Sequence, residues 1–153
     1  MLAVVRIKGI VGMSHHVKDT LKMLRLDTTN SCSIIPETKI YRGMIQVIKD
    51  HVTFGEVDKE TVTKLLEKRL RMTSNNKRVD EKSLKSLTGF NSYSELADML
   101  LQGTVKLNSF KGIQPNFRLT PPSKGFKSVN EHYPRGDIGN RGKEIKTLIE
   151  SMI

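Results

Sequence analysis

The 153-residue sequence contains no tryptophan and only one cysteine, Cys32, and aromatic residues make up just 5% of it. A single cysteine cannot form an internal disulfide, which fits a reducing compartment. No apolar run approaches the roughly 18 residues that a membrane-spanning helix needs. The opening MLAVVRIKG is interrupted by Arg6 too early for a signal peptide. We therefore expect a cytoplasmic protein.

The residue patterns that support catalysis or metal binding are also missing. Two of the four histidines are adjacent, the other two are far apart, and no H-x-E, H-E-x-x-H or C-x-x-C spacing occurs. Cys32 stands in an apolar segment, which favours a small buried side chain over a nucleophile. Gly136, Gly139 and Gly142 follow no hydrophobic strand, and the G-x-x-G that Gly136 and Gly139 form is too short to identify an RNA clamp. We expect no enzyme, no metal, no cofactor and no small-molecule substrate.

Positive charge, in contrast, is abundant. The chain carries 26 Lys and Arg against 16 Asp and Glu, a formal net charge of +10. Such an excess indicates a polyanionic partner, and nucleic acid is the leading class. A membrane surface is a weaker candidate, because basic and large apolar residues do not share one helix as an interfacial anchor requires.

The first 57 residues follow a strand-helix-strand-helix-strand order. Alternation and apolar runs predict strands at residues 2–8, 31–36 and 51–57. The first strand should have one basic-ended face, formed by its even-numbered residues. Ser14 and Thr38 are predicted to cap two helices between these strands. The residues expected to face the core from these helices are Val17, Leu21 and Leu24 in the first and Ile40, Met44, Val47 and Ile48 in the second.

Residues 58–153 are predicted to form a helical and irregular extension. Asp58 can cap a helix, a short helical turn is expected at residues 83–87, and Ser92 with Glu95 has the spacing of a capping box. Gly103 stands where that helix should end. The last eleven residues are predicted to form an amphipathic helix that packs into a hydrophobic groove. The apolar positions of these helices are Val62, Leu65, Leu66 and Leu70, then Leu96, Met99 and Leu100, and finally Ile145, Leu148, Ile149 and Met152.

Between these helices, residues 119–142 (LTPPSKGFKSVNEHYPRGDIGNRG) show neither helical nor strand periodicity. Basic residues outnumber acidic ones there. From residue 105 onward, Phe110, Phe117, Phe126 and Tyr133 stand between the basic residues. Lys and Arg can neutralise phosphates and aromatic rings can stack on unpaired bases. For any single residue, a solvated basic side chain or a ring packed inside the protein is the more common outcome. Because such a segment is costly to order alone, we hypothesise that it binds RNA and becomes ordered only there.

Residues 20–57 carry a family resemblance. The LRL at residues 24–26, the Pro-x-Thr turn at 36–38 and the Tyr-Arg-Gly-Met at 41–44 resemble the large-subunit ribosomal protein thirty family, called protein seven in eukaryotes. Bacterial members of that family have only the core. The later GDIGNRGKEIKTLI at residues 136–149 resembles the extended archaeal and eukaryotic members, and the absence of a long basic N-terminal extension fits the archaeal type.

The resemblance implies a ferredoxin-like α/β (α+β) core at residues 1–57 with a three-stranded antiparallel sheet. Helical crossovers between consecutive strands would by themselves suggest parallel strands. The family resemblance also implies a non-catalytic component of the large ribosomal subunit. This component would contact rRNA, including a position near 5S rRNA, and neighbouring ribosomal proteins. A non-ribosomal RNA- or DNA-binding protein is the main alternative, and a small ligand-binding domain is a third.

The expected RNA contacts fall into three groups. The exposed face of the first helix supplies one, and the resemblance implies a second at the start of the second helix, where a glycine allows close backbone approach. The extension supplies the third. The residues are Lys18, Lys22 and Arg25, then Lys39, Arg42 and Gly43, and finally Lys111, Arg118, Lys124, Lys127, Arg135 and Arg141. The last helix is less basic than the family resemblance suggests, and we interpret it as a packing element.

Overall fold

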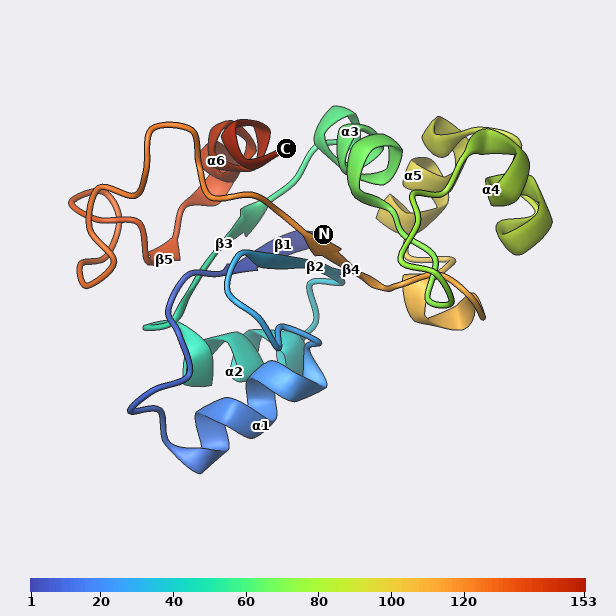
Figure 1. The fold of residues 1–153 in the computed structure, drawn as a ribbon. Helices are drawn as coiled ribbons and strands as arrows, with labels where there is room; N and C mark the ends of the chain where they lie inside the picture. Colours follow the sequence, from blue (N-terminus) through green and yellow to red (C-terminus); the bar gives the residue numbers. More distant parts are fainter.

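The computed structural model describes residues 1–153, apart from the side chain of Lys82. Its strands and helices follow the predicted order through the first third of the chain and continue with four further α-helices and two short strands (Figure 1). The strands are β1 (Leu2–Arg6), β2 (Ser31–Ile35), β3 (Val52–Glu56), β4 (Asn116–Arg118) and β5 (Gly139–Asn140). The α-helices are α1 (His15–Met23), α2 (Lys39–Ile48), α3 (Lys59–Arg69), α4 (Glu81–Thr88), α5 (Tyr93–Leu101) and α6 (Ile145–Met152), and the short 3-10 helices are η1 (Leu107–Ser109) and η2 (Gly142–Glu144).

The sheet has the order β4-β2-β1-β3-β5, with β1 at its centre. Strands β2 and β3 both pair antiparallel with β1, so the antiparallel core that the resemblance implies is confirmed. The α2 crossover joins β2 to β3, which run in the same direction but are separated by β1. A helical crossover therefore does not require adjacent parallel strands here.

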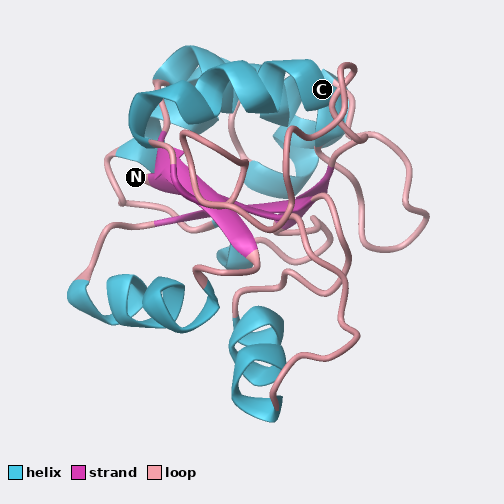
Figure 2. Cartoon of the chain, turned by 90° about the vertical axis from the view of Figure 1, so that its left-hand side faces the viewer, coloured by secondary structure: helices cyan, strands magenta, loops and turns pink.

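Helices cover both faces of this sheet, which Figure 2 shows between them. Leu2 and Val4 of β1 pack in a hydrophobic cluster with residues of α1 and α2. Ala3 and Val5 belong to a second cluster, which includes Cys32 and residues of α3, α5 and α6. All five residues of β1 are consequently buried. Burial raises the pKa of the Cys32 thiol to about 12, so the reactive thiolate is scarce at neutral pH.

The prediction of a basic-ended face on β1 is wrong at Arg6, which is buried with 2% of its surface exposed. Its guanidinium donates hydrogen bonds to the backbone oxygens of Leu26 (2.8 Å), Asp27 (2.6 Å) and Lys8 (3.0 Å). Two of these bonds satisfy carbonyl groups just after α1. Arg6 therefore serves the fold and is not available to a partner.

The predicted buried stripe of α2 is wrong at two positions. Ile40 is 77% exposed and Val47 is 49% exposed, whereas Ile45 and Ile48 are buried. The helix faces the sheet with Tyr41, Ile45 and Ile48, an i, i+4, i+7 pattern that leaves Ile40 and Val47 on another side. The predicted cap is confirmed, since the hydroxyl of Thr38 accepts a hydrogen bond from the backbone N–H of Tyr41.

The helices of the extension largely follow the prediction. The inward residues of α3 are buried, and the hydroxyl of Ser92 caps α5 by accepting from the backbone N–H of Glu95 (3.2 Å). Gly103 follows α5 with a φ of +74°, which glycine adopts without strain. All four predicted apolar residues of α6 are buried, and α6 packs against α3 and β3. The interpretation of the last helix as a packing element thus agrees with its burial.

The extension also adds the two edge strands, which sequence periodicity missed. Strand β4 pairs antiparallel with β2, and β5 pairs parallel with β3. With three and two residues, these strands are too short to show alternation. Because residues on both sides of position 57 share one hydrophobic cluster, we propose that the core 1–57 and the extension 58–153 fold together as one unit.

Candidate nucleic-acid interface

The predicted cations of the core lie in the layer formed by α1 and α2. Lys18, Lys22 and Arg25 are exposed on α1 and just after it, and Lys39 and Arg42 are exposed at the start of α2. The two helices pack against each other, so the structure brings both groups to the same side of the sheet (Figure 1). Arg42 also pairs with Glu37 and lowers the pKa of that carboxyl group, mainly through a hydrogen bond between the side chains.

Gly43 lies in the middle of α2 and is exposed. A Cβ atom built on it meets nothing within 4 Å, and its φ is not positive. Neither packing nor backbone conformation within the chain therefore requires a glycine here, although glycine destabilises a helix interior by about 0.5–1 kcal/mol relative to alanine. The unexplained glycine is consistent with close approach by a partner.

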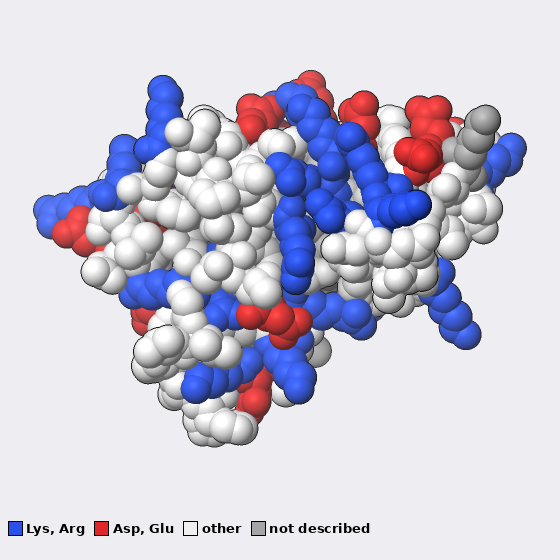
Figure 3. Space-filling model, viewed as in Figure 1, with Lys and Arg blue, Asp and Glu red and all other residues white. Residues whose placement is uncertain are grey.

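The predicted cations of the extension are spread across the molecule. Arg118 is exposed on β4, and Lys127 and Arg135 are exposed on the loop beside β5, at the opposite edge of the sheet. Lys111 and Lys124 are exposed in the connections around β4. Figure 3 shows Lys and Arg side chains over several elements of one face, interrupted by smaller groups of Asp and Glu.

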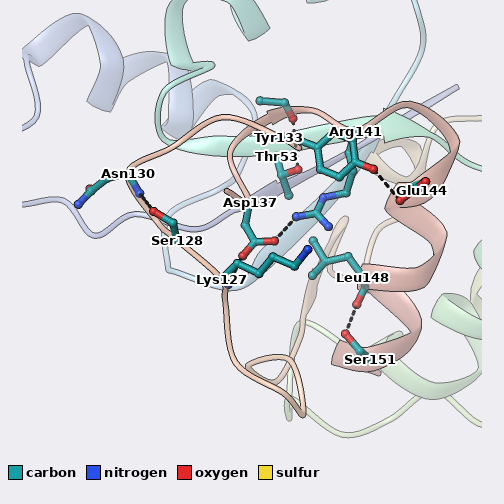
Figure 4. Close-up of polar contacts among 11 residues, drawn as sticks. Thr53, Lys127, Ser128, Asn130, Tyr133, Asp137, Arg141, Glu144, Leu148 and Ser151 are labelled. Carbon is teal, nitrogen blue, oxygen red and sulfur yellow. Dashed lines mark hydrogen bonds and ion pairs between the residues drawn. The ribbon is translucent and has the colours of Figure 1, made fainter. Parts of the chain in front are cut away.

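Arg141 differs from the other predicted cations because its side chain is only 11% exposed. Its guanidinium forms an ion pair with the buried carboxylate of Asp137 and lies over the Tyr133 ring, 5.1 Å from the ring centre (Figure 4). The Tyr133 hydroxyl in turn donates to Glu144 at 2.7 Å. This network makes Arg141 part of the internal framework of the loop rather than an exposed phosphate ligand.

The aromatic rings of the extension also serve the protein interior, which is the alternative to base stacking. Phe117 is fully buried, Phe110 packs edge-on against Phe90 with ring centres 6.3 Å apart, and Phe126 packs on the hydrophobic cluster. The face of the Tyr133 ring is covered by the Arg141 guanidinium. These four rings consequently already have contacts inside the protein and do not form a free stacking surface for bases.

Ion pairs separate two classes of basic residue. Lys59, Lys64 and Lys146 pair with carboxylates on neighbouring helices at 2.6–3.0 Å. Among the described side chains, nine of the predicted cations form no such pair. They are Lys18, Lys22, Arg25, Lys39, Lys111, Arg118, Lys124, Lys127 and Arg135. Their charge remains available to an external polyanion.

Comparisons with known proteins identify the family of this chain. The family model described as ribosomal protein L30p/L7e matches residues 2–52. The chain is 45% identical to the large ribosomal subunit protein uL30 of Archaeoglobus fulgidus over 99% of both chains. This chain belongs to the uL30 family. Further uL30 relatives are those of Nanoarchaeum equitans, 43% identical over 97% of this chain and 96% of the relative, and Methanococcus maripaludis, 42% identical over 99% and 98%.

Two exposed apolar side chains beside the cations of this uL30-family chain were missed by the sequence analysis. Met23, at the end of α1, is 72% exposed, and Ile40 adjoins Lys39. The sequence could have indicated the exposure of Met23, because Met23 does not lie on the helix face formed by Val17, Leu21 and Leu24. An apolar residue outside that face does not point to the core.

The described residues also bear on the other predicted classes. No group of three or more His, Cys, Asp or Glu among them is placed to hold a metal ion. None of the described helices is long and apolar enough to cross a membrane. Gly136 and Gly139 of the G-x-x-G stretch are buried, and Cβ atoms built on them come within 2.2 Å of the Glu131 backbone oxygen and 2.6 Å of His132 Nδ1. Internal packing explains both glycines.

Proposed function

We propose that this protein binds rRNA of the large ribosomal subunit through the exposed cations of α1, α2 and the extension. As a member of the uL30 family it is a structural protein of the large ribosomal subunit and not an enzyme, and it works among rRNA and other ribosomal proteins. The observation that carries the proposed interface is the set of nine predicted cations that form no ion pair with an acid among the side chains that the structure describes. Unpaired surface cations release the counterions of RNA when they bind phosphates.

The proposed set is the predicted one without Arg141, whose charge is already used inside the protein. Arg42 stays in the set because its side chain remains 68% exposed despite the pair with Glu37. We also propose a position near 5S rRNA, which the family resemblance alone supports. Crosslinking of purified large subunits, followed by sequencing of the attached RNA, would test that position.

Sedimentation of a cell lysate through a sucrose gradient at low and high salt tests the assignment. We expect this protein to comigrate with the large subunit in both conditions. Protein found only at the top of the gradient would contradict the proposed function and favour a free RNA or DNA partner.

The charge of α1 can be tested by binding to deproteinised large-subunit rRNA. If about six phosphates are neutralised, the log-log dependence of affinity on salt should have a slope of roughly −4 to −5. Changing Lys18, Lys22 and Arg25 to Gln should weaken binding and flatten the slope by about 2. The control changes the exposed Lys68, Lys77 and Lys85 to Gln, which removes the same charge elsewhere. Equal effects of the two triple changes would contradict a localised interface.

Gly43→Ala separates binding from folding. Because a Cβ at this position meets nothing within the chain, we expect the free energy of unfolding to rise by about 0.5–1 kcal/mol. Affinity for the rRNA should nevertheless fall, since the methyl group blocks close backbone approach. Chemical denaturation and filter binding measure the two quantities. Unchanged affinity would remove Gly43 from the interface.

A further inference from the structure

A groove runs between the core and the extension, next to the end of α1. Its core side includes Met23, Arg25 and Ile34, and its extension side includes Val105, Lys106 and Asn108. Its free volume is about 70 Å³, so it is a shallow groove, smaller than a cavity that encloses a whole small ligand. The groove exists only because the extension packs beside β2, so neither part of the chain forms it alone.

The walls of the groove are largely apolar. The exposed Met23 side chain and the half-buried Ile34 and Val105 side chains contribute from both parts of the chain. Methionine is flexible and polarisable, and it packs well against flat aromatic surfaces. The walls thus suit a planar apolar group.

The rim carries positive charge on both sides. Arg25 lies on the core side and Lys106 on the extension side, both are exposed, and neither forms an ion pair among the described side chains. The backbone at Arg25 is held in place, because its N–H donates to Lys22 O (2.9 Å) and its carbonyl oxygen accepts from the side-chain amide of Asn116 (3.0 Å). Arg25 also has a left-handed φ of +57°, a conformation that costs a non-glycine residue about 1 kcal/mol or more. The fold therefore fixes one cation at the edge of an apolar slot.

We propose that this groove holds an unpaired nucleotide of rRNA, with its base between the apolar walls and its flanking phosphates against Arg25 and Lys106. The inference rests on the proposed function and assigns it a specific site. The flat π faces of a base suit the apolar walls, and the anionic phosphates on either side of that base suit the two cations. Bases that are paired in a helix cannot enter, so the groove selects a bulged or looped nucleotide.

Methyl NMR of the full chain tests the occupant directly. The methionine methyl groups are labelled, and single-stranded hexa-adenylate is the probe, with a blunt RNA duplex and inorganic polyphosphate as comparators. We expect the Met23 methyl signal to shift with the single strand and much less with either comparator. The buried Met152 is the internal control and should not move. A stationary Met23 signal, or equal shifts with polyphosphate, would overturn the inference.

Binding to deproteinised large-subunit rRNA tests the same site with the natural partner. Met23→Ala should lower affinity by about tenfold, because the apolar contact between Met23 and the bound base is lost, while the salt slope stays the same. The matched control is Val11→Ala, which truncates another exposed apolar residue, 95% exposed and outside the groove. Thermal unfolding of both variants should match the unchanged protein, since neither side chain is buried.

The outcomes of this comparison are distinct. If Met23→Ala binds the rRNA as well as the unchanged protein, the groove inference is wrong and the proposed function stands. If that variant binds rRNA normally but is lost from assembled subunits, the groove docks another protein, which also overturns the inference. If the unchanged protein itself fails to bind the rRNA, the proposed function is what fails.

Discussion

Asp137→Ala is expected to destabilise the protein by about 3 kcal/mol and to loosen the loop around residues 127–141, because it leaves a mostly buried guanidinium without its partner. The Asp137 side chain is 7% exposed, and one of its oxygens accepts from Arg141. The other oxygen accepts from the backbone N–H of Lys127. The Asp137 carboxylate thus ties its own part of the loop to Lys127, ten residues earlier, and to Arg141, four residues later (Figure 4).

Two measurements check this expectation. Chemical denaturation gives the change in the free energy of unfolding, and hydrogen exchange of the isolated protein reports whether the amides near Lys127 and Asp137 are protected. Protection before and exchange after the substitution would show that the loop is ordered without RNA, against the hypothesis that it orders only on binding. Fast exchange in the unchanged protein would instead support that hypothesis.

The control for Asp137→Ala is Glu150→Ala. Glu150 forms the exposed pair with Lys64 at 2.7 Å between α6 and α3. Because solvent and salt screen an exposed pair, its loss should change stability little. Equal losses of unfolding free energy in the two variants would contradict the idea that burial makes the Asp137–Arg141 pair more important for stability.

Gly55→Ala is the second substitution with a large expected effect. Gly55 lies in β3 opposite Ala3, and a Cβ atom built on it comes within 2.1 Å of the Gly142 backbone oxygen and 2.9 Å of the Ile145 Cβ. The segment that contains β5, η2 and the start of α6 can approach the sheet only if this position has no side chain. We expect a loss of about 1–3 kcal/mol, typical of overpacking, and a displaced start of α6.

The matched control for Gly55→Ala is Gly43→Ala. It makes the same chemical change at a glycine with open space around it, and stability should rise. Denaturation curves of the two variants, measured together, separate the effect of close packing from that of glycine itself. Stability that is unchanged in Gly55→Ala would contradict the tight packing of residue 142 on β3.

Asp137→Ala and Gly55→Ala both disturb contacts that hold the extension in place. The order of the extension also affects RNA binding. Lys127 and Arg135 are carried by the loop that Asp137 holds. A loop that is ordered in advance loses less conformational entropy when it binds than a disordered one. The internal ion pair of Arg141 is thus expected to support binding through the position of its neighbours.

Much of this protein follows from its sequence alone. The order of the first five elements, the α3 and α6 faces and the Ser92 cap depend on contacts between residues close in the chain, and local periodicity records those contacts. The prediction of an rRNA-binding function also came from the sequence. It depends on the excess of positive charge, the missing catalytic patterns and the 20–57 motif, which are visible in composition or in short residue spacings.

Only the tertiary structure decided which side chains are exposed and able to contact a partner. The sequence analysis treated Arg6 and Arg141 as surface cations. Arg6 is instead buried against backbone oxygens about twenty residues away, and Arg141 is held in an ion pair with Asp137. Strand direction, the β4 and β5 edges and the exposure of Ile40 likewise depend on packing between remote elements. The groove beside Met23 joins residues that stand some eighty positions apart. Local patterns carry no record of such contacts, because burial and charge pairing are set by whatever the fold brings alongside.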